Sequence, residues 1–288
     1  MNEKVIQWYP GHMAKTRRLM KESLPLIDAV CELVDARVPE SSRNPDLDGI
    51  IGSKPRIVLL NKCDLADERA TARKIKELAE RGVTALPVDC RSGKGLEKFE
   101  PAVREMLKDK IKANADKGMA GKPLRVMVVG IPNTGKSSFI NRMAGKYRAK
   151  VADKPGVTRG NQWFAIGSGI ELLDTPGVLW PKFEDPQVGL KLAFIGSIKE
   201  TTLDIQELAV SLLSVMQKNY PDRLEQRYKV AGVQDVQEPY ELLEMIAAKR
   251  GMLLRKGEYD TERAAVMLLD EYRSGKLGKI TLDCAVGG

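Results

Sequence analysis

The chain has 288 residues, of which 43% are hydrophobic, 30% charged and only 5% aromatic, and its formal net charge is +8. The length is sufficient for two domains with hydrophobic cores, and the hydrophobic share excludes a disordered chain. No apolar run approaches the ~18 residues of a membrane span, and the polar first ten residues predict no secretory signal. The positive charge indicates a polyanionic partner, whereas the low aromatic share argues against binding of nucleic acid by base stacking.

The cysteine and histidine content indicates a reducing compartment. Cys31, Cys63, Cys90 and Cys284 are scattered and form no Cys-x-x-Cys pair, and His12 is the single histidine. A zinc site or a disulfide framework would need a denser pattern. We therefore expect a cytoplasmic protein that is monomeric in solution, with no disulfide-linked partner and no membrane association.

Short apolar runs alternate with helical patterns through the first 185 residues. This alternation predicts an α/β domain with a mainly parallel sheet covered by helices on both faces. We expect it to span residues 25–186, after a basic arm and helix at residues 1–24. The predicted strands are 29–34, 56–60, 83–88, 124–129, 163–166 and 170–173, and the predicted helices are 13–24, 67–80, 96–115 and 136–144.

The pattern changes after residue 186. Residues 203–216, 240–249 and 262–272 have helical spacing, and no convincing strand lies among them. We therefore expect a smaller, all-α domain over 187–288. Within the first domain, the glycines and proline of 116–123 predict a linker.

A glycine-rich loop between the strand at 124–129 and the helix at 136–144 predicts a phosphate site. Residues 130–137 fit the pattern G-x-x-x-x-G-K-S, in which backbone N–H groups surround the phosphates. Lys136 is placed for the β- and γ-phosphates and Ser137 for Mg²⁺. A glycine-rich turn with an incidental lysine is the alternative. The nucleotide-contacting residues expected here are Asn133, Thr134, Gly135, Lys136, Ser137 and Ser138.

Two further segments fit a nucleoside triphosphate. Asp174 ends a predicted strand and suits a Mg²⁺ contact, and the Gly177 N–H suits the γ-phosphate. Thr158 lies in a basic loop where a second Mg²⁺-binding hydroxyl is expected. The alternatives are an ordinary Asp-Thr-Pro-Gly turn and a surface threonine.

A third motif, Asn61-Lys62-Cys63-Asp64, follows a buried-looking strand and predicts a base site. The Asp64 carboxylate can accept hydrogen bonds from guanine N1–H and the 2-amino group, while the stem of Lys62 packs on the base. Adenine lacks this pair of donors, so the motif favours GTP over ATP. The alternative is a polar strand-to-helix loop.

The order of these motifs is unusual, because the base motif at 61 precedes the phosphate loop at 130. The same sheet is retained if the chain is circularly permuted, with 116–123 joining the former termini. The segments at 150–160 and 174–186 then lead directly into the helical domain. Loss of the γ-phosphate is therefore expected to reorient that domain.

Several stretches carry a family resemblance: Trp8-Tyr9-Pro10-Gly11-His12-Met13, Val34-Asp35-Ala36-Arg37, Asn61-Lys62-Cys63-Asp64, the phosphate loop and 172–185. In these stretches the chain resembles the circularly permuted GTPases of the bacterial ribosome biogenesis GTPase A family. The resemblance implies cytosolic GTP hydrolysis coupled to late assembly of the large ribosomal subunit, with ribosomal RNA bound by the C-terminal helical domain.

The second base-contacting loop departs from the family pattern. It usually carries a small pair such as Ser-Ala or Asn-Ala, and here it reads Asp89-Cys90-Arg91. We expect Cys90 to contact the base through its backbone and Arg91 to lie beside the nucleotide. The side-chain roles of Asp89 and Arg91 stay open.

The residue after the Asp-x-x-Gly element bears on catalysis. Many G proteins have a glutamine there that orients the attacking water, and this chain has Val178. We therefore expect slow intrinsic hydrolysis that rises when a partner completes the site. The resemblance implies two candidates for the missing group: His12, and a K⁺ ion held by Asn133. The expected catalytic residues are His12, Lys136, Thr158 and Gly177.

Three other functions were weighed against a GTP-hydrolysing assembly factor. An ATP-using P-loop enzyme is disfavoured by Asn61 and Asp64. A non-catalytic RNA-binding scaffold would use GTP only as a structural ligand. A membrane-associated GTPase would use 13–24 as an amphipathic anchor, but that helix lacks aromatic residues and a large apolar face.

The position of the charge predicts the contact surface. Residues 187–288 hold 14 basic and 15 acidic residues, so the positive excess lies in 1–186, concentrated at 1–24, 104–125 and 142–160. Either the GTPase domain itself meets RNA, or the helical domain uses a local basic face. The expected RNA-binding residues are Lys15, Arg17, Arg18, Lys249, Arg250, Arg255 and Lys256.

Overall fold

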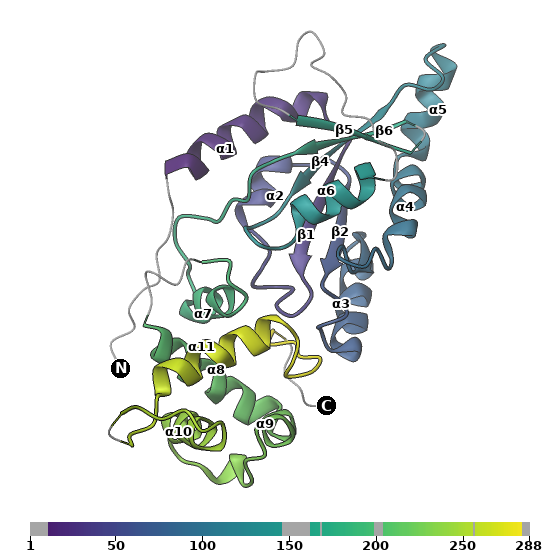
Figure 1. Ribbon diagram of the computed structural model, residues 1–288. Helices are drawn as coiled ribbons and strands as arrows, with labels where there is room; N and C mark the ends of the chain where they lie inside the picture. The colour runs from purple at the N-terminus through teal and green to yellow at the C-terminus, as the bar shows by residue number, and fades with distance from the viewer. Residues whose placement is uncertain (1–10, 146–161, 168, 199–203, 256, 284–288) are drawn as a thin grey trace.

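The computed structural model describes residues 11–145, 162–167, 169–198, 204–255 and 257–283, with only the backbone of residues 11 and 12 (Figure 1). The part of the chain outside these ranges includes residues named above: Trp8, Tyr9, Pro10, Thr158, Lys256 and Cys284, together with the side chain of His12. The same holds for the loop 150–160.

The centre of the molecule is one six-stranded sheet with the strand order β3-β2-β1-β4-β6-β5. Every neighbouring pair is parallel except β5 with β6, which is antiparallel. The predicted α/β fold with a mainly parallel sheet is thereby confirmed. The strands are β1 (Ala29–Asp35), β2 (Arg56–Asn61), β3 (Thr84–Val88), β4 (Leu124–Val129), β5 (Gln162–Ile166) and β6 (Ile170–Asp174).

Helices cover both faces of this sheet, and a separate group of helices follows it (Figure 1). The prediction of one helix over 96–115 was wrong, because the chain leaves helical geometry at Leu107 and two shorter helices result. The helices are α1 (Gly11–Ser23), α2 (Asp46–Ile51), α3 (Glu68–Glu80), α4 (Phe99–Met106), α5 (Lys108–Asp116), α6 (Lys136–Gly145), α7 (Pro186–Phe194), α8 (Ile205–Asn219), α9 (Pro221–Tyr228), α10 (Pro239–Lys249) and α11 (Thr261–Arg273).

The register explains why motifs far apart in sequence meet. Strand β1 lies between β2 and β4, with Asp35 opposite Asn61. Because parallel strands end at the same edge, the loops after β1, β2, β4 and β6 gather there. The permuted chain therefore keeps its base and phosphate loops on one side of the sheet.

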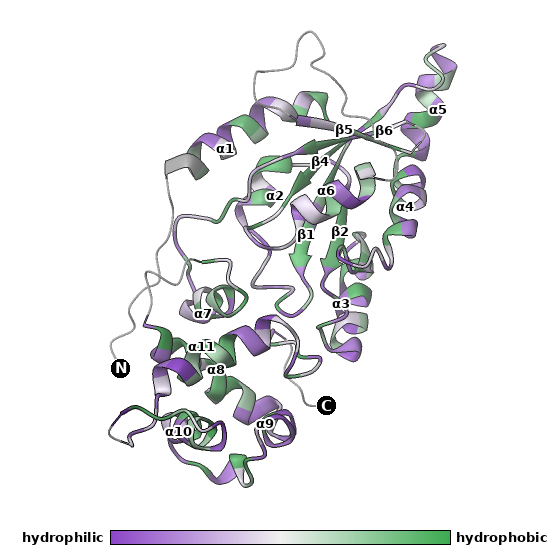
Figure 2. Ribbon diagram, in the orientation of Figure 1, coloured by the Kyte–Doolittle hydropathy of each residue, from purple (hydrophilic) through white to green (hydrophobic). Residues whose placement is uncertain are grey.

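Hydrophobic residues pack against both faces of the sheet, and strands β1, β2 and β4 are mostly hydrophobic (Figure 2). Under α4 and α6 lies one core, in which the rings of Phe99 and Phe139 meet edge to face, 5.0 Å apart. The opposite face, with Met127 and Val129 of β4, continues without a break into the C-terminal helices. The helical region is therefore packed on the sheet domain rather than tethered to it.

The C-terminal helices pack around α8, which contacts α10 and α11. Asp204 begins α8 by accepting hydrogen bonds from the N–H groups of Gln206 and Glu207. After α11 the chain returns to the sheet, where the Leu282 N–H donates to the Arg37 carbonyl oxygen at 2.7 Å. This returning tail fastens the helical region to the loops after β1 and β2.

Candidate functional site

The loop between β4 and α6 has a backbone that only glycine permits at two points. Gly130 has a φ of +152°, and a Cβ there would lie 2.5 Å from the carbonyl oxygen of Leu33. Gly135 has a φ of +99°, and a Cβ there would collide with the side-chain amide of Asn61. Helix α6 begins directly afterwards, so its first N–H groups and the exposed hydroxyl of Ser137 lie beside the loop. This strand–loop–helix arrangement is the one that phosphate binding requires.

The base motif is hydrogen-bonded directly to the phosphate loop. The Asn61 side chain donates to the carbonyl oxygen of Thr134 at 2.6 Å and accepts from the N–H of Cys90 at 2.9 Å. The Lys62 ammonium donates to the carbonyl oxygen of Asn133 at 2.8 Å. Three loops predicted to form one site are thus brought together.

The remaining residues of the predicted base site are Asp64, with an exposed carboxylate, and the loop that contains Asp89 and Arg91. Asp64 is exposed, and no hydrogen bond joins it to the described residues. Asp89 accepts from the N–H groups of Arg91 and Ser92 at 2.8 and 3.2 Å, so its side chain shapes its own loop. Burial would raise the pKa of Asp89, but these hydrogen bonds outweigh it and lower the pKa. The Arg91 side chain is exposed, and its place beside the nucleotide stays a prediction.

Cys90 belongs to the loop after β3 and is hydrogen-bonded to the base motif. It is buried, and burial raises the pKa of its thiol to about 12, so the thiol is neutral at pH 7. Its N–H already donates to Asn61. A direct contact between this N–H and the base therefore stays a prediction.

The Lys136 side chain bends back onto the phosphate loop. Its ammonium donates to the carbonyl oxygen of Ile131 at 2.8 Å, and the residue as a whole is 8% exposed. Burial lowers the pKa of Lys136 to about 8, although the nearby charge of Asp174 opposes the shift. Burial likewise raises the pKa of Asp174, against the effect of Lys136. Phosphate oxygens would give this ammonium negatively charged partners and would favour its protonated form.

The oxygen atoms near this lysine fit Mg²⁺ bound together with a nucleotide. Ser137 offers a hydroxyl and Asp174 a half-buried carboxylate, and both are hard oxygen ligands. Among the described residues no group of three or more His, Cys, Asp and Glu side chains could hold a metal alone. Mg²⁺ usually keeps waters and takes phosphate oxygens, so one hydroxyl and one carboxylate are a suitable protein contribution.

The segment after β6 lies close against the phosphate loop. A Cβ on Gly177 would lie 2.8 Å from the Pro132 nitrogen and 3.0 Å from the Lys136 ammonium. Val178 follows, buried, with its N–H donating to the Gly130 carbonyl oxygen at 3.3 Å. Only glycine fits this approach, and the apolar Val178 side chain cannot orient water.

Sequence reasoning missed two contacts of these loops. The Asn44 side chain donates to the carbonyl oxygen of Val178 at 3.1 Å, and the Ser197 hydroxyl donates to that of Pro132 at 2.7 Å. In addition, the Asn133 amide nitrogen donates to the carbonyl oxygen of Gly196. No spacing in the sequence pairs these residues, since each contact joins segments more than sixty residues apart.

The basic residues of the first helix differ in availability. Lys15 is exposed. Arg17 forms an ion pair with Asp46 at 2.8 Å, and Arg18 forms a weaker one with Glu22 at 3.4 Å. All three lie on α1, which borders the sheet.

The basic residues of the helical region surround an exposed turn. Lys249 and Arg255 are exposed, whereas the Arg250 guanidinium lies 5.3 Å over the ring of Tyr228. Between them Leu253 is 56% exposed. The structure thus separates these cations from those of α1 and does not form one basic face.

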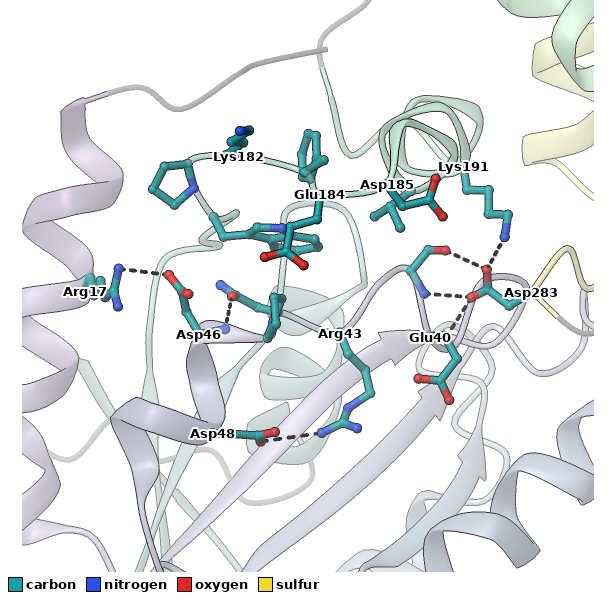
Figure 3. A pocket seen from close by; sticks show the side chains of 17 residues that line it. Arg17, Glu40, Arg43, Asp46, Asp48, Lys182, Glu184, Asp185, Lys191 and Asp283 are labelled. Carbon is teal, nitrogen blue, oxygen red and sulfur yellow. Dashed lines mark hydrogen bonds and ion pairs between the residues drawn. The ribbon is translucent and has the colours of Figure 1, made fainter. Parts of the chain in front are cut away.

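A cavity of about 840 Å³ lies apart from the nucleotide loops (Figure 3). Its walls include residues 40, 41 and 43–46, residues 180–185 and two side chains of α7. Arg17 and Asp46 pair at one end and Lys191 and Asp283 at the other. No described residue of the base or phosphate loops lines it, so it is not the nucleotide site.

The part of the chain that the structure describes contains no helix with the length and hydrophobicity of a membrane span.

Comparisons with known proteins agree with this site. The family model described as "50S ribosome-binding GTPase" matches residues 125–247, a range that starts at the phosphate strand. The chain is 49% identical to ribosome biogenesis GTPase A of Priestia megaterium and 47% identical to that of Bacillus cereus. These matches cover 96% and 97% of this chain and 96% and 94% of the relatives.

A solved structure has the same fold. The GNP-bound structure of YlqF from T. maritima is 26% identical and has a TM-score of 0.63, over 93% of this chain and 97% of the other. Together with the sheet order and the interlocked loops, these matches define a circularly permuted P-loop GTPase, which binds guanine nucleotide and hydrolyses GTP. Within that class, the chain belongs to the ribosome biogenesis GTPase A family.

Proposed function

We propose that this GTPase acts in the cytoplasm in late maturation of the large ribosomal subunit. In the proposal it binds the subunit precursor, through ribosomal RNA and proteins, in its GTP-bound state. The support is the family membership and the matching description of a 50S ribosome-binding GTPase.

The observation that carries the proposal is the contact between the phosphate loop and the helical region. Ser197 and Gly196, between α7 and α8, hydrogen-bond to Pro132 and Asn133. The segment after Gly177 also runs directly into α7. A change at the γ-phosphate would therefore alter how the helical region is held, and with it the surface offered to a particle.

Within the site we assign the following roles. Asp64 reads the guanine edge while Asn61 and Lys62 hold the base and phosphate loops together. Lys136 and the N–H groups of 133–138 neutralise and orient the phosphates, and the Gly177 N–H senses the γ-phosphate. Mg²⁺ would be held by Ser137, Asp174 and Thr158, and it would neutralise charge on the β- and γ-phosphates.

Two arrangements would supply the catalytic group that Val178 cannot provide. In one, His12 orients the water. In the other, the free oxygen of the Asn133 side chain helps to hold K⁺, while its nitrogen stays with Gly196. Either group would be completed by contact with the particle, which gives slow hydrolysis in its absence.

The proposed particle surface has two parts. The helical region 187–288 offers the exposed turn with Lys249, Arg255 and Leu253, and the arm 1–24 offers Lys15 and Arg18. Lysine and arginine contact phosphates, and exposed apolar side chains suit ribosomal protein or bases. In the proposal, Lys256 also contacts RNA, and so does Arg250 once its guanidinium leaves the ring of Tyr228.

GTP turnover measured alone, with large subunits and with small subunits tests this proposal. We expect turnover well below one per second alone and an increase of about tenfold or more only with large subunits. His12→Ala should abolish the increase if His12 orients the water, whereas replacing KCl by NaCl should abolish it if K⁺ does. Equal turnover under all conditions, or stimulation by small subunits alone, would refute the proposed function.

A further inference from the structure

Asp35 and Arg37 form a buried ion pair to which the GTPase site described above gives no role. They stand at the end of β1, and their side chains are 0% and 2% exposed. The guanidinium makes two parallel contacts, from Nε to Asp35 Oδ1 at 2.9 Å and from Nη2 to Oδ2 at 2.8 Å. Such a bidentate ion pair fixes both side chains in one orientation.

The Asp35 carboxylate also touches the base motif. Its Oδ2 lies 2.9 Å from the Lys62 ammonium, whose other contact is the Asn133 carbonyl oxygen of the phosphate loop at 2.8 Å. Burial by itself would raise the pKa of Asp35, but Arg37 and Lys62 hold it well below its usual range. The carboxylate is therefore charged near pH 7, and it holds the lysine through an ion pair.

The third nitrogen of Arg37 reaches the helical region. Nη1 donates to the carbonyl oxygens of Tyr272 and Arg273, at 3.3 and 3.2 Å, at the end of α11. The guanidinium also lies 5.2 Å from the centre of the Tyr272 ring. Carbonyl groups at a helix C-terminus carry partial negative charge, so they hold the guanidinium from the side opposite Asp35.

From this chain of contacts we propose that Asp35 and Arg37 are positioning residues for guanine-nucleotide binding. Arg37, fixed by the end of α11, orients the Asp35 carboxylate, and the carboxylate holds Lys62 in the place where its stem covers the base. The inference rests on the proposed role of Lys62. It adds that the affinity for guanine nucleotide depends on a contact with the C-terminal helices.

The test is a double-mutant cycle on the affinity for fluorescently labelled GDP, using the full-length protein. We expect Asp35→Asn and Lys62→Met each to weaken GDP binding about tenfold. If Asp35 acts through Lys62, adding Asp35→Asn to Lys62→Met should weaken binding by less than about twofold more. A purely structural role of Asp35 would instead give losses that multiply.

Two further variants separate this effect from misfolding. Asp35→Asn leaves the buried Arg37 charge unpaired, whereas Asp35→Asn combined with Arg37→Met removes both charges and should fold while still losing affinity. Glu32→Gln is the matched control, because Glu32 lies on the same strand, is 1% exposed and pairs with Arg56 at 3.2 Å, away from the nucleotide loops. It should change GDP affinity by less than about twofold.

The outcomes distinguish a failure of the proposed base site from a failure of the positioning role of Asp35 and Arg37. Unchanged affinity in Lys62→Met, which keeps an apolar stem, would overturn the anchoring of Lys62, whereas unchanged affinity in both Lys62→Met and Asp64→Asn would overturn the proposed base site itself. A loss in Lys62→Met with none in Asp35→Asn, or with multiplicative losses in the double variant, would overturn only the positioning role of Asp35 and Arg37.

Discussion

Asp64 has the most direct chemical task in the proposed site. Its carboxylate is exposed, no hydrogen bond joins it to the described residues, and it follows the anchored Asn61 and Lys62. A carboxylate that meets two N–H donors of guanine leaves costly unmatched lone pairs with any other base.

Exchange of this carboxylate for an amide should therefore change the base preference. Asp64→Asn is expected to weaken GTP binding about 100-fold and to improve binding of xanthosine triphosphate, whose 2-oxo group can accept from the new amide. Competition between the two nucleotides against labelled GDP measures the change. An unaltered preference for GTP would place the base contact on another residue.

The positions of these single residues were predictable only in part. The motif at 61–64 and the glycines of the phosphate loop identified one site, because the ends of parallel strands share an edge. The role of Arg37 was not predictable, since its contacts with α11 join residues more than 230 positions apart. Its motif was noticed in the sequence only as a family resemblance.

The helices and strands predicted from the sequence agree with the structure where the local hydrophobic pattern is strong. Strand β4 has the predicted bounds, since its β-branched run is enclosed by Pro123 and Gly130. Helix α2 has only 6 residues, too few to show a periodicity. The sequence pattern does not predict helix α7 either, because the pattern changes at its starting Pro186 and its last three residues are all buried.

The C-terminal helices are joined by a partly buried ion pair that makes a pH prediction possible. Glu271 of α11 accepts hydrogen bonds from Arg227 of α9 and from the Tyr228 hydroxyl, the latter at 2.9 Å. The hydrogen bond from Arg227 is the main cause that lowers the pKa of Glu271 from 4.5. A carboxyl group with a lowered pKa stabilises the fold above its unfolded pKa and loses this effect as the pH falls through its folded pKa.

Glu271→Gln should therefore destabilise the protein by about 1–3 kcal/mol at pH 7, and the difference should shrink below about pH 4.5. The measurement is urea unfolding of both proteins over a pH series. Glu262→Gln, an exposed change on the same helix, is the control and should leave the free energy of unfolding nearly unchanged. A difference that grows on acidification would contradict this role of Glu271.

The two regions of the molecule are locked together by the chain beyond α11. The Asp283 carboxylate is 2% exposed and accepts from the N–H groups of Glu40 and Ser41, both at 2.7 Å. It also pairs with Lys191 of α7 at 2.9 Å. One side chain therefore connects the tail, the loop after β1 and the helix that follows the γ-phosphate segment.

Asp283→Ala should lower the free energy of unfolding by about 2 kcal/mol, because several donors, most of them partly buried, lose their acceptor. Urea unfolding measures this loss, and Asp270→Ala, an exposed carboxylate on α11, is the comparison. Equal effects of the two substitutions would show that the tail contributes nothing special to the docking of the helical region.

At the level of the complete molecule, the account joins nucleotide state to particle binding. The phosphate loop contacts the segment between α7 and α8, the base motif reaches α11 through Arg37, and one hydrophobic core spans both regions. Nucleotide and helical region are thereby expected to respond together, and by linkage a particle should alter nucleotide affinity as much as nucleotide alters particle affinity.

Sedimentation of cell extract with a non-hydrolysable GTP analogue or with GDP tests this central claim most directly. The account predicts that the protein migrates with the large ribosomal subunit or its precursor in the presence of the GTP analogue and as free protein with GDP. Migration as free protein in both states, or with the large subunit equally in both, would contradict it.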